Sequence, residues 1–319
     1  MTEATDFVTL SHSIDPYGSQ ATPACGNIQG QYERREHVMG ADREPTMRAA
    51  WLGQELKRMR QAHKVTAKDI ADYLGKAQSS ISRLESGLYP ARLNEVDSYL
   101  DICGVRDPQR RSSLSTMCED IGQRGWWDGY DGDVASSLMD RAWIDERTVN
   151  LRVCDMTYMP GLLQTPRYAE AMFKVANPKL DSREIKRWLS FRTTRQHIVT
   201  RHDAINLHCL LDEFVLQRTA GTVDTMREQL DYLVQASKHD NVELRILPGH
   251  SCNGLNGPFE VLELMDPYPN VAFVTTPAGD ICVEGTRVES LARTYDRLAN
   301  DSLSGEASRK LIKAARDKL

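Results

Sequence analysis

The sequence predicts two domains of different class, an all-helical domain followed by an α+β domain. Apolar residues recur at helical spacing over about 46–124, and the glycine- and tryptophan-rich stretch "RGWWDGYDGD" then interrupts this pattern. Beyond it, strand-like alternation is interleaved with amphipathic helices. At 319 residues the chain is long enough for two cores of ordinary size.

Composition indicates a soluble, cytoplasmic protein. Hydrophobic residues make up 40% and charged residues 27%. No apolar run approaches the roughly 20 residues that span a bilayer, and the first residues resemble no secretory leader. The seven cysteines are scattered without a CxxC pair, so we expect reduced thiols rather than a disulfide framework.

Residues 1–45 collect Gly, Pro, Ser and Asn without a sustained period, and we expect a disordered extension there. The predicted domains are therefore a disordered segment at 1–45, a helical domain at 46–124 and an α+β domain at 125–319.

Five helices are expected in the helical domain. The first runs from about Met47 to Arg60, and the second from about Ala67 to Leu74 with Thr66 as its N-cap. The third lies in "GKAQSSISRLESG", and the last two lie in "LNEVDSYLDICG" and "QRRSSLSTMCEDIG".

The second and third helices have the spacing of a helix-turn-helix motif. Ile70, Leu74, Ile81 and Leu84 supply the apolar positions, and Gly75 stands at the turn, where a positive φ is accessible. In this motif the first residues of the second helix enter the major groove of DNA. That placement explains why this helix opens with polar side chains.

Gln78 can donate to and accept from adenine, the serines can bond a base edge or a phosphate, and Arg83 can reach guanine or phosphate. An ion pair of Arg83 with Glu85 or another neighbouring acid is the alternative for that arginine. Arg58 and Arg60 are further candidates for contacts with the DNA backbone. The candidate DNA-binding residues are Lys68, Lys76, Gln78, Ser79, Ser80, Ser82 and Arg83.

Charge is distributed unevenly along the chain. Residues 46–92 hold nine Lys or Arg against four Asp or Glu, a net +5 within a chain of net −5, so the remainder carries −10. A small basic module on an acidic body is typical of a nucleic-acid-binding domain attached to a different one.

The second domain combines strands and helices. Its first strand, "TVNLRVCDM", alternates Val149, Leu151 and Val153 on one face. Further strands are expected in "INLHCLL", "VELRILP", "FEVLEL", "VAFVTT" and "DICVEG". Helices are expected in "TPRYAEAMFKVA", "SREIKRWLSFRTTRQHIV", "TVDTMREQLDYLVQASKH", "VESLARTYDRLAN" and "ASRKLIKAARDK".

A binding site is expected around "PGLLQTPRYAEAM". Free amides of the turn before Thr165 can face a ligand, and Arg192 and Arg195, three residues apart, share a helix face that suits a carboxylate or an acidic partner. The alternative is a plain helix start with Thr165 as N-cap and Pro166 following. The candidate effector- or partner-binding residues are Gly161, Leu162, Leu163, Gln164, Thr165, Arg192, Arg195 and Gln196.

No convincing catalytic, metal or cofactor motif is present. His250 and Cys252 share the loop "GHSCNG", but no third group that would orient such a pair is identifiable. Neither common spacing of phosphate-binding glycines occurs. We therefore expect no enzyme and no cofactor.

Several separated segments resemble a known family. "VTAKDIADYLGKAQSSISRLESG" is similar to the DNA-binding domain of XRE (xenobiotic-response-element) regulators. "PGLLQTPRYAEAM", "RTTRQ", "LDEFVL", "MREQLDYLV" and "NGPFEVLEL" resemble the C-terminal domain of an actinobacterial branch with antitoxin-like, or WhiJ-like, members. This resemblance implies a regulator of development or secondary metabolism, with a small partner protein encoded nearby.

We therefore expect a cytoplasmic, nucleoid-associated transcription regulator that binds double-stranded DNA as a homodimer, because one recognition helix reads too few base pairs. A small protein or a small-molecule effector would act through its C-terminal domain. One alternative is an antitoxin-like protein that sequesters a small partner and uses DNA binding for autoregulation. Another is an enzyme joined to a DNA-binding module.

Overall fold

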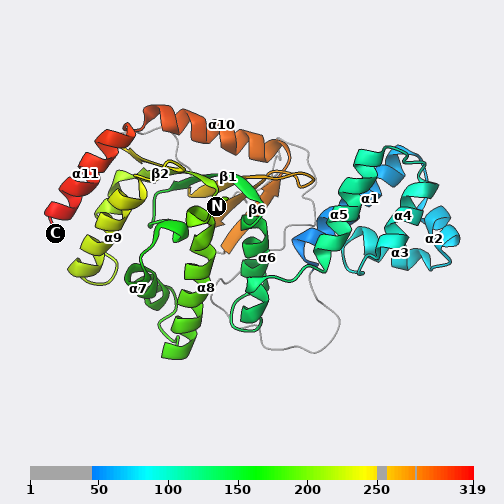
Figure 1. The fold of residues 1–319 in the computed structure, drawn as a ribbon, viewed down its shortest axis with the longest axis horizontal. Coiled ribbons are helices and arrows are strands. Elements are labelled where there is room, and N and C mark those ends of the chain that lie inside the picture. Colours follow the sequence, from blue (N-terminus) through cyan, green and yellow to red (C-terminus); the bar gives the residue numbers. More distant parts are fainter. Residues whose placement is uncertain (1–44, 250–256, 277–278) are drawn as a thin grey trace, which may run out of the picture.

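The computed structural model describes residues 45–249, 257–276 and 279–319. A helical lobe is followed by a lobe built on a mixed sheet, which confirms the predicted fold class (Figure 1). The expected disorder of residues 1–45 falls almost entirely outside the described residues, as do His250 and Cys252. The described cysteines, Cys103, Cys118, Cys154, Cys209 and Cys282, are free and buried.

The helical lobe consists of five helices, as expected. They are α1 (Met47–Ala62), α2 (Ala67–Leu74), α3 (Gln78–Glu85), α4 (Leu93–Ile102) and α5 (Pro108–Ile121). Thr66 caps α2 by accepting from the amide of Asp69, whose carboxylate accepts from the amide of Thr66 in return. The core includes Leu56, Ile70 and Val96, all fully buried.

Two glycines let α1 approach the end of α3. A Cβ on Gly53 would lie 2.6 Å from the carbonyl oxygens of Leu84 and Glu85. Gly87, which follows α3 with φ of 71°, would place a Cβ 2.7 Å from the amide nitrogen of Ala50. Only residues without a side chain permit this backbone-to-backbone packing.

The second lobe contains a six-stranded sheet in the order β3-β2-β1-β4-β5-β6, in which β1, β2 and β3 are parallel and β4, β5 and β6 add antiparallel. All six strands were expected. They are β1 (Thr148–Asp155), β2 (Asn206–Asp212), β3 (Val242–Leu247), β4 (Phe259–Leu264), β5 (Val271–Thr276) and β6 (Gly279–Glu284).

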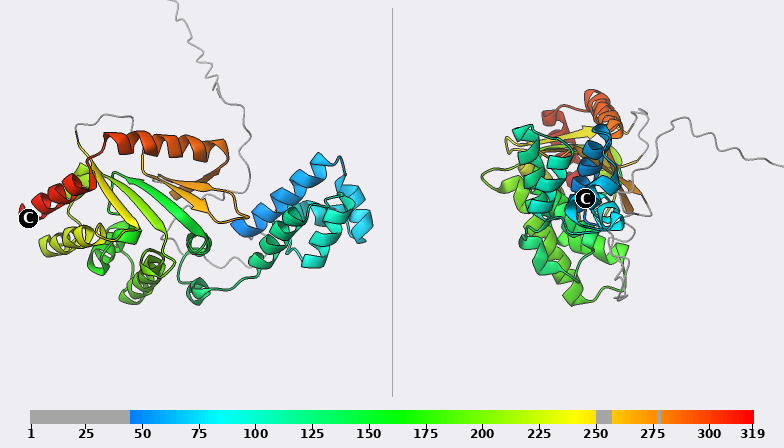
Figure 2. Two further views of the ribbon diagram at one scale, coloured as in Figure 1. Left: turned by 45° about the horizontal axis from the view of Figure 1, so that its top comes forward. Right: turned by 90° about the vertical axis from the view of Figure 1, so that its right-hand side faces the viewer.

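Helices cover both faces of this sheet. The long helix α10 lies along one face, where Tyr295 and Leu298 pack on Cys154, Leu210 and Phe259. The helices α6, α7, α8 and α9 lie on the other side (Figure 2). The bounds are α6 (Ser136–Asp145), α7 (Pro166–Ala176), α8 (Ser182–Thr200), α9 (Val223–Ala236), α10 (Thr286–Asp301) and α11 (Gly305–Asp317), with short 3-10 helices η1 (Trp126–Tyr130), η2 (Gly161–Leu163) and η3 (Glu213–Leu216).

Two features differ from the sequence prediction. The helix α6 was not expected, although it becomes important for the link between the lobes. Val149 was expected to share a buried face with Leu151 and Val153, but its side chain is 45% exposed. The cause is a register shift between Thr148 and Asn150 where β1 pairs with β4, which breaks the alternation at the start of the strand.

The two lobes meet at an aromatic cluster. Trp51 of α1 lies 6.1 Å from Trp143 of α6 and 5.7 Å from Tyr268, measured between ring centroids. Its indole nitrogen donates to Glu284 at the end of β6, at 2.6 Å. Because Trp51 and Trp143 are buried, this junction joins the lobes through a shared core rather than a solvated tether.

Candidate nucleic-acid interface

The turn between α2 and α3 has the geometry that the sequence predicted. Gly75 ends α2 in the left-handed conformation, with φ of 62°, and the amide of Lys76 donates to Ala71 at 2.9 Å. A tight turn of this kind sets the second helix across the first, and α3 then starts at Gln78.

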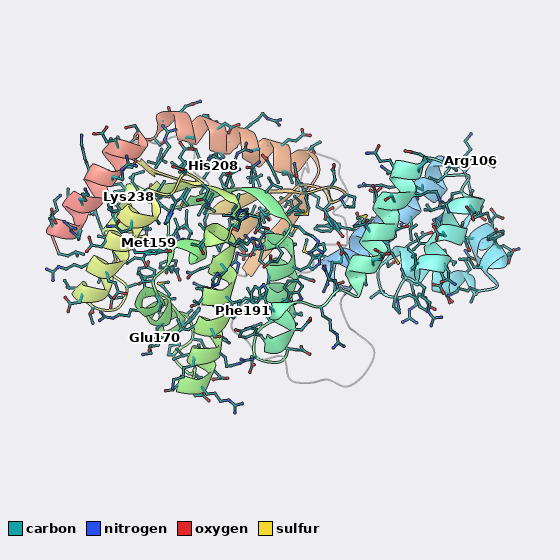
Figure 3. The ribbon with its side chains drawn as sticks, viewed as in Figure 1. Arg106, Met159, Glu170, Phe191, His208 and Lys238 are labelled. Carbon is teal, nitrogen blue, oxygen red and sulfur yellow. The ribbon has the colours of Figure 1, made fainter. Side chains whose placement is uncertain are left out.

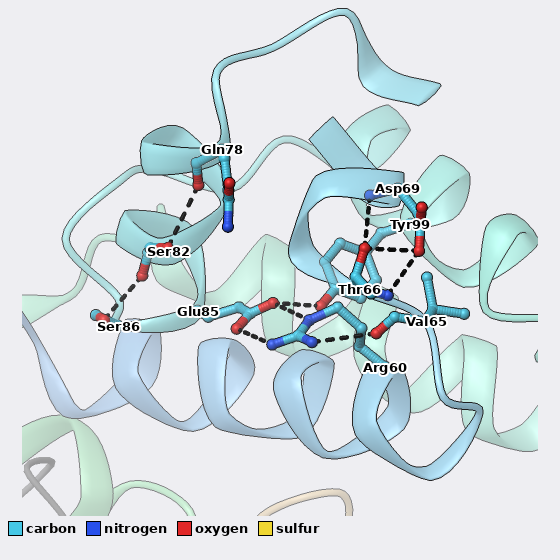
Figure 4. A network of polar contacts seen from close by, with 9 residues as sticks. All are labelled: Arg60, Val65, Thr66, Asp69, Gln78, Ser82, Glu85, Ser86 and Tyr99. Atoms are coloured by element: carbon cyan, nitrogen blue, oxygen red, sulfur yellow. Dashed lines mark hydrogen bonds and ion pairs between the residues drawn. The ribbon is translucent and has the colours of Figure 1, made fainter. Parts of the chain in front are cut away.

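Helix α3 has a buried face and a polar exposed face. Ile81 and Leu84 are 1% and 4% exposed and pack into the core. The exposed face carries Gln78, Ser79, Ser82 and Arg83, and Ser80 is half-buried beside it. The Ser82 hydroxyl donates to the backbone of Gln78 at 3.3 Å, which leaves its oxygen lone pairs as acceptors (Figure 4).

A buried ionic network holds α3 against its neighbours (Figure 4). The Glu85 carboxylate accepts from the Arg60 guanidinium at 2.6 and 2.9 Å and from the Tyr99 hydroxyl at 2.7 Å. Arg60 also donates to the carbonyl of Val65 at 3.1 Å. Burial, followed by the hydrogen bond to Glu85, raises the pKa of Tyr99 well above its ordinary value. The network ties α1, α3 and α4 together and fixes the recognition helix.

This network corrects two expectations. Arg60 was a candidate for the DNA backbone, but its guanidinium is half-buried and bound to Glu85. Glu85 was the alternative partner of Arg83, and it binds Arg60 instead. Among the described residues Arg83 forms no ion pair, so its exposed guanidinium is available to a ligand.

The two candidate lysines occupy different environments. Lys68 is exposed on the first turn of α2. The Lys76 ammonium lies 2.6 Å from Glu95 and 3.0 Å from the Tyr89 hydroxyl. The hydrogen bond to Glu95 raises the pKa of Lys76. Lys76 therefore braces α3 against α4, while Lys68 faces solvent.

The candidate effector residues lie together. On α8, the Gln196 amide donates to the carbonyls of Gly161 and Gln164 at 2.8 Å each, and Arg192 donates to the side-chain oxygen of Gln164. Arg195, one turn further along, bonds Asp145 of α6.

The turn before α7 is held internally. Leu162, Leu163, Gln164 and Thr165 are buried. The amide of Leu163 donates to the carbonyl of Pro160 at 2.8 Å, so it does not face a ligand as expected. The amide of Thr165 donates to the side chain of Gln229 at 2.7 Å. Thr165 caps α7 by accepting from the amide of Tyr168, as the alternative reading predicted.

Two buried residues of this site escaped the sequence reasoning. Asp145 has a side chain only 1% exposed, and it binds both Arg141, at 2.9 Å, and Arg195. Gln229 of α9 also donates to the carbonyl of Leu163 at 2.6 Å. Asp145 could have been identified in the sequence from its position four residues after Arg141, which places the two side chains on one helix face.

Neither a metal site nor a membrane span is found among the described residues. In the part of the chain that the structure describes, no group of three or more His, Cys, Asp or Glu is placed to hold a metal ion. No helix within the same part is long and apolar enough to cross a membrane.

Comparison with protein-family models accounts for both lobes. Residues 51–114 match a model described as a helix-turn-helix domain, which makes the chain a DNA-binding regulator by its N-terminal lobe. Residues 138–314, more than half of the chain, match a domain of unknown function, DUF5753. The chain belongs to the DUF5753 family. No curated protein and no solved structure matches it.

The DUF5753 region begins inside α6 and ends inside α11, so it contains the whole sheet and the candidate effector residues. The helix-turn-helix match covers α2, α3 and α4 together with most of α1 and part of α5. Trp51 and Trp143 lie in different matched regions, and their contact therefore joins the DNA-binding domain to the DUF5753 domain.

Proposed function

We propose that the protein is a sequence-specific transcription regulator of the XRE type that reads the major groove with α3. The observation that carries the proposal is an exposed polar face on α3, formed by Gln78, Ser79, Ser82 and Arg83. A half-buried ion pair of Arg60 with Glu85 holds α3 itself, and one of Lys76 with Glu95 holds the turn before it. Short polar side chains let a helix sit deep in the groove, and a fixed helix loses little conformational entropy on binding.

The proposed contacts have distinct roles. Gln78 reads adenine through its paired donor and acceptor, and Arg83 reaches guanine or a phosphate. Ser79 accepts or donates at a base edge or a phosphate, Ser82 accepts from a base edge, and Lys68 neutralises a phosphate. Lys76 and Ser80 were candidates from the sequence. We assign Lys76 a bracing role, because its ammonium is bound to Glu95, and Ser80 a secondary one, because it is half-buried.

The protein would act in the cytoplasm at the nucleoid as a homodimer, because a single α3 covers too few base pairs for specificity. The DUF5753 domain would carry the control function, through a small-molecule effector or a small protein encoded nearby. The resemblance to actinobacterial, WhiJ-like regulators supports this arrangement.

An antitoxin-like role is the second candidate, in which the chain sequesters a small protein and DNA binding serves autoregulation. One observation favours it. An open groove of about 380 Å³ lies between α7 and the start of α9, and Val175 on its wall is 65% exposed. A groove of this size is large enough to receive side chains of a partner protein.

Selection of DNA sites from a random pool by the purified full chain tests the main proposal. A recurring two-fold symmetric sequence should emerge, and binding to it should weaken steeply with salt. Each neutralised phosphate contributes about −0.9 to the log–log slope, so a dimer should give about −4 or steeper. If the pool yields no preferred sequence and binding is flat in salt, the proposal is wrong. If the chain instead binds a small protein encoded by a neighbouring gene and selects no preferred DNA sequence, the antitoxin-like role is supported.

A further inference from the structure

A narrow cavity opens between α6, α7 and α8. Phe173, Trp188 and Phe191 supply aromatic walls, and Arg192 and Arg195 supply two guanidinium groups, together with two aliphatic side chains. Figure 3 shows Phe191 between α8 and α6. Among the residues described, no acidic side chain lines the cavity. Two cationic groups beside apolar walls suit an anion attached to an apolar body.

The size of the cavity limits what can enter. The enclosed inner part has a free volume of about 20 Å³, whereas the space around it, including the part open to solvent, is about 360 Å³. The inner part therefore accepts only a terminal group, and the rest of a ligand would occupy the mouth. A folded protein partner is too large for it.

The two guanidiniums are already oriented. Arg192 stacks over Phe173, with its central carbon 4.7 Å from the ring centroid, and donates to Gln164. Arg195 donates to Asp145. Held arginines lose less side-chain entropy when they bind a carboxylate, and their planar fork matches its two oxygens.

Asp145 links this cavity to a larger ionic chain. It is shared between Arg195 and Arg141, and Arg141 continues to Glu260 on β4. Burial raises the pKa of Asp145, but Arg195 and Arg141 together outweigh it and lower that pKa below its ordinary value. Asp145 is therefore ionised at neutral pH, and an incoming carboxylate would compete with it for Arg195.

Helix α6, which carries Asp145, also contacts α1 of the helical lobe. Asp140, five residues before Asp145, accepts from the amide of Met47 at 3.1 Å, at the first residue of α1. Trp143 packs on Trp51 of the same α1. A change in how Arg195 holds Asp145 therefore acts on the helix that positions α1. The close packing around Gly53 couples α1 in turn to α3.

We propose that this cavity is an effector site for small apolar carboxylic acids, and that α6 transmits its occupancy to the DNA-binding domain. The carboxylate binds Arg192 and Arg195, and the apolar body lies against the aromatic walls. Competition for Arg195 loosens Asp145 and repositions α6 against α1. The transmission half of this proposal rests on the proposed function, whereas the binding half does not.

The binding half is tested on the full chain by isothermal calorimetry and tryptophan fluorescence, with phenylacetate and hexanoate as probes. Phenylacetamide and hexanamide are the matched neutral compounds. The acids should bind at least tenfold more tightly than the amides. Arg192→Met should weaken the acids at least tenfold, whereas Arg183→Met, at an exposed position on the same helix, should leave them unchanged.

The result that overturns the site is failure of both acids to bind, or binding that Arg192→Met does not alter. A further overturning result is loss of a protein partner in Arg192→Met when neither acid binds, because the site would then serve a protein. Circular dichroism of Arg192→Met at the assay temperature shows that the variant is folded.

The transmission half is tested by measuring the affinity for selected DNA with and without phenylacetate. We expect a change of about fivefold or more, the usual lower range of allosteric coupling. Trp51→Leu should still bind phenylacetate but lose most of that change. Acid binding without any change in DNA affinity would refute transmission. Failure to bind selected DNA at all, with acid binding intact, would refute the proposed function and leave the site standing.

Discussion

Replacing Gly53 with alanine tests the packing that fixes the recognition helix. The added Cβ would lie 2.6 Å from two carbonyl oxygens at the end of α3, whereas ordinary contacts begin near 3.4 Å. Both atoms belong to the backbone, so no side-chain rotation relieves the clash. The end of α3 must move by several tenths of an ångström or α1 must bend.

The free energy of unfolding should fall by about 2 kcal/mol. Overpacking of a tight site costs up to about 3 kcal/mol, and the higher helix propensity of alanine than of glycine offsets about 1 kcal/mol of that cost. Specific DNA binding should fall as well, even at temperatures where the variant is fully folded, because α3 is displaced.

Urea denaturation followed by circular dichroism measures the loss of stability. Gly122→Ala is the matched control, since its Cβ would meet only the carbonyl of Glu119 at an ordinary 3.8 Å and its φ of −86° suits alanine. We expect the control to remain within about 0.5 kcal/mol of the wild type. If Gly53→Ala proves as stable as the control, the close approach of α1 and α3 is wrong.

Further outcomes are expected for four variants. Lys68→Ala should reduce the salt slope of DNA binding by about 0.9 per subunit, whereas Lys76→Ala should leave the slope nearly unchanged and cost about 2 kcal/mol of stability by leaving Glu95 without its cation. The pKa of Asp145 is lower in the folded protein than its ordinary 3.8, so ionised Asp145 stabilises the fold above pH 3.8, and this contribution is lost as the pH falls. In urea titrations the free energy of unfolding should therefore fall less steeply with acid in Asp145→Asn than in the wild type. Trp51→Leu removes the indole bond to the other lobe and two ring contacts, and should split one calorimetric unfolding transition into two.

Periodicity was enough to predict most of the fold. The helical repeats of α1 to α5 and the short β-branched segments of the second lobe are local patterns, and the structure has an element at each of them. Caps were equally local, because Thr66 and Thr165 bond amides within three residues. The helix α6 was missed because its inner face mixes Arg141 and Asp145 with apolar residues.

The electrostatic roles could not be predicted from the sequence. Arg60 and Glu85 are 25 residues apart, and only the packing of α1 against α3 makes them partners. From the sequence Lys76 is an ordinary surface cation, because only the packing of α4 places Glu95 beside it. Gln164 and Arg192, by contrast, were chosen for local reasons, Gln164 as part of a turn with free amides and Arg192 because it shares a helix face with Arg195. In the structure Arg192 donates to the side chain of Gln164.

The most direct measurement of the central claim compares Gln78→Ala with the wild type on the selected DNA site and on a scrambled duplex. Gln78 is exposed and Ile81 and Leu84 still face the core, so the fold should persist. Specific binding should weaken by about 1–3 kcal/mol, with discrimination relaxed mainly at one base pair per half-site and binding to the scrambled duplex unchanged. Gln109→Ala, an exposed glutamine on α5, should change neither. Equal weakening on both duplexes would contradict the assignment of α3 as the helix that reads the bases.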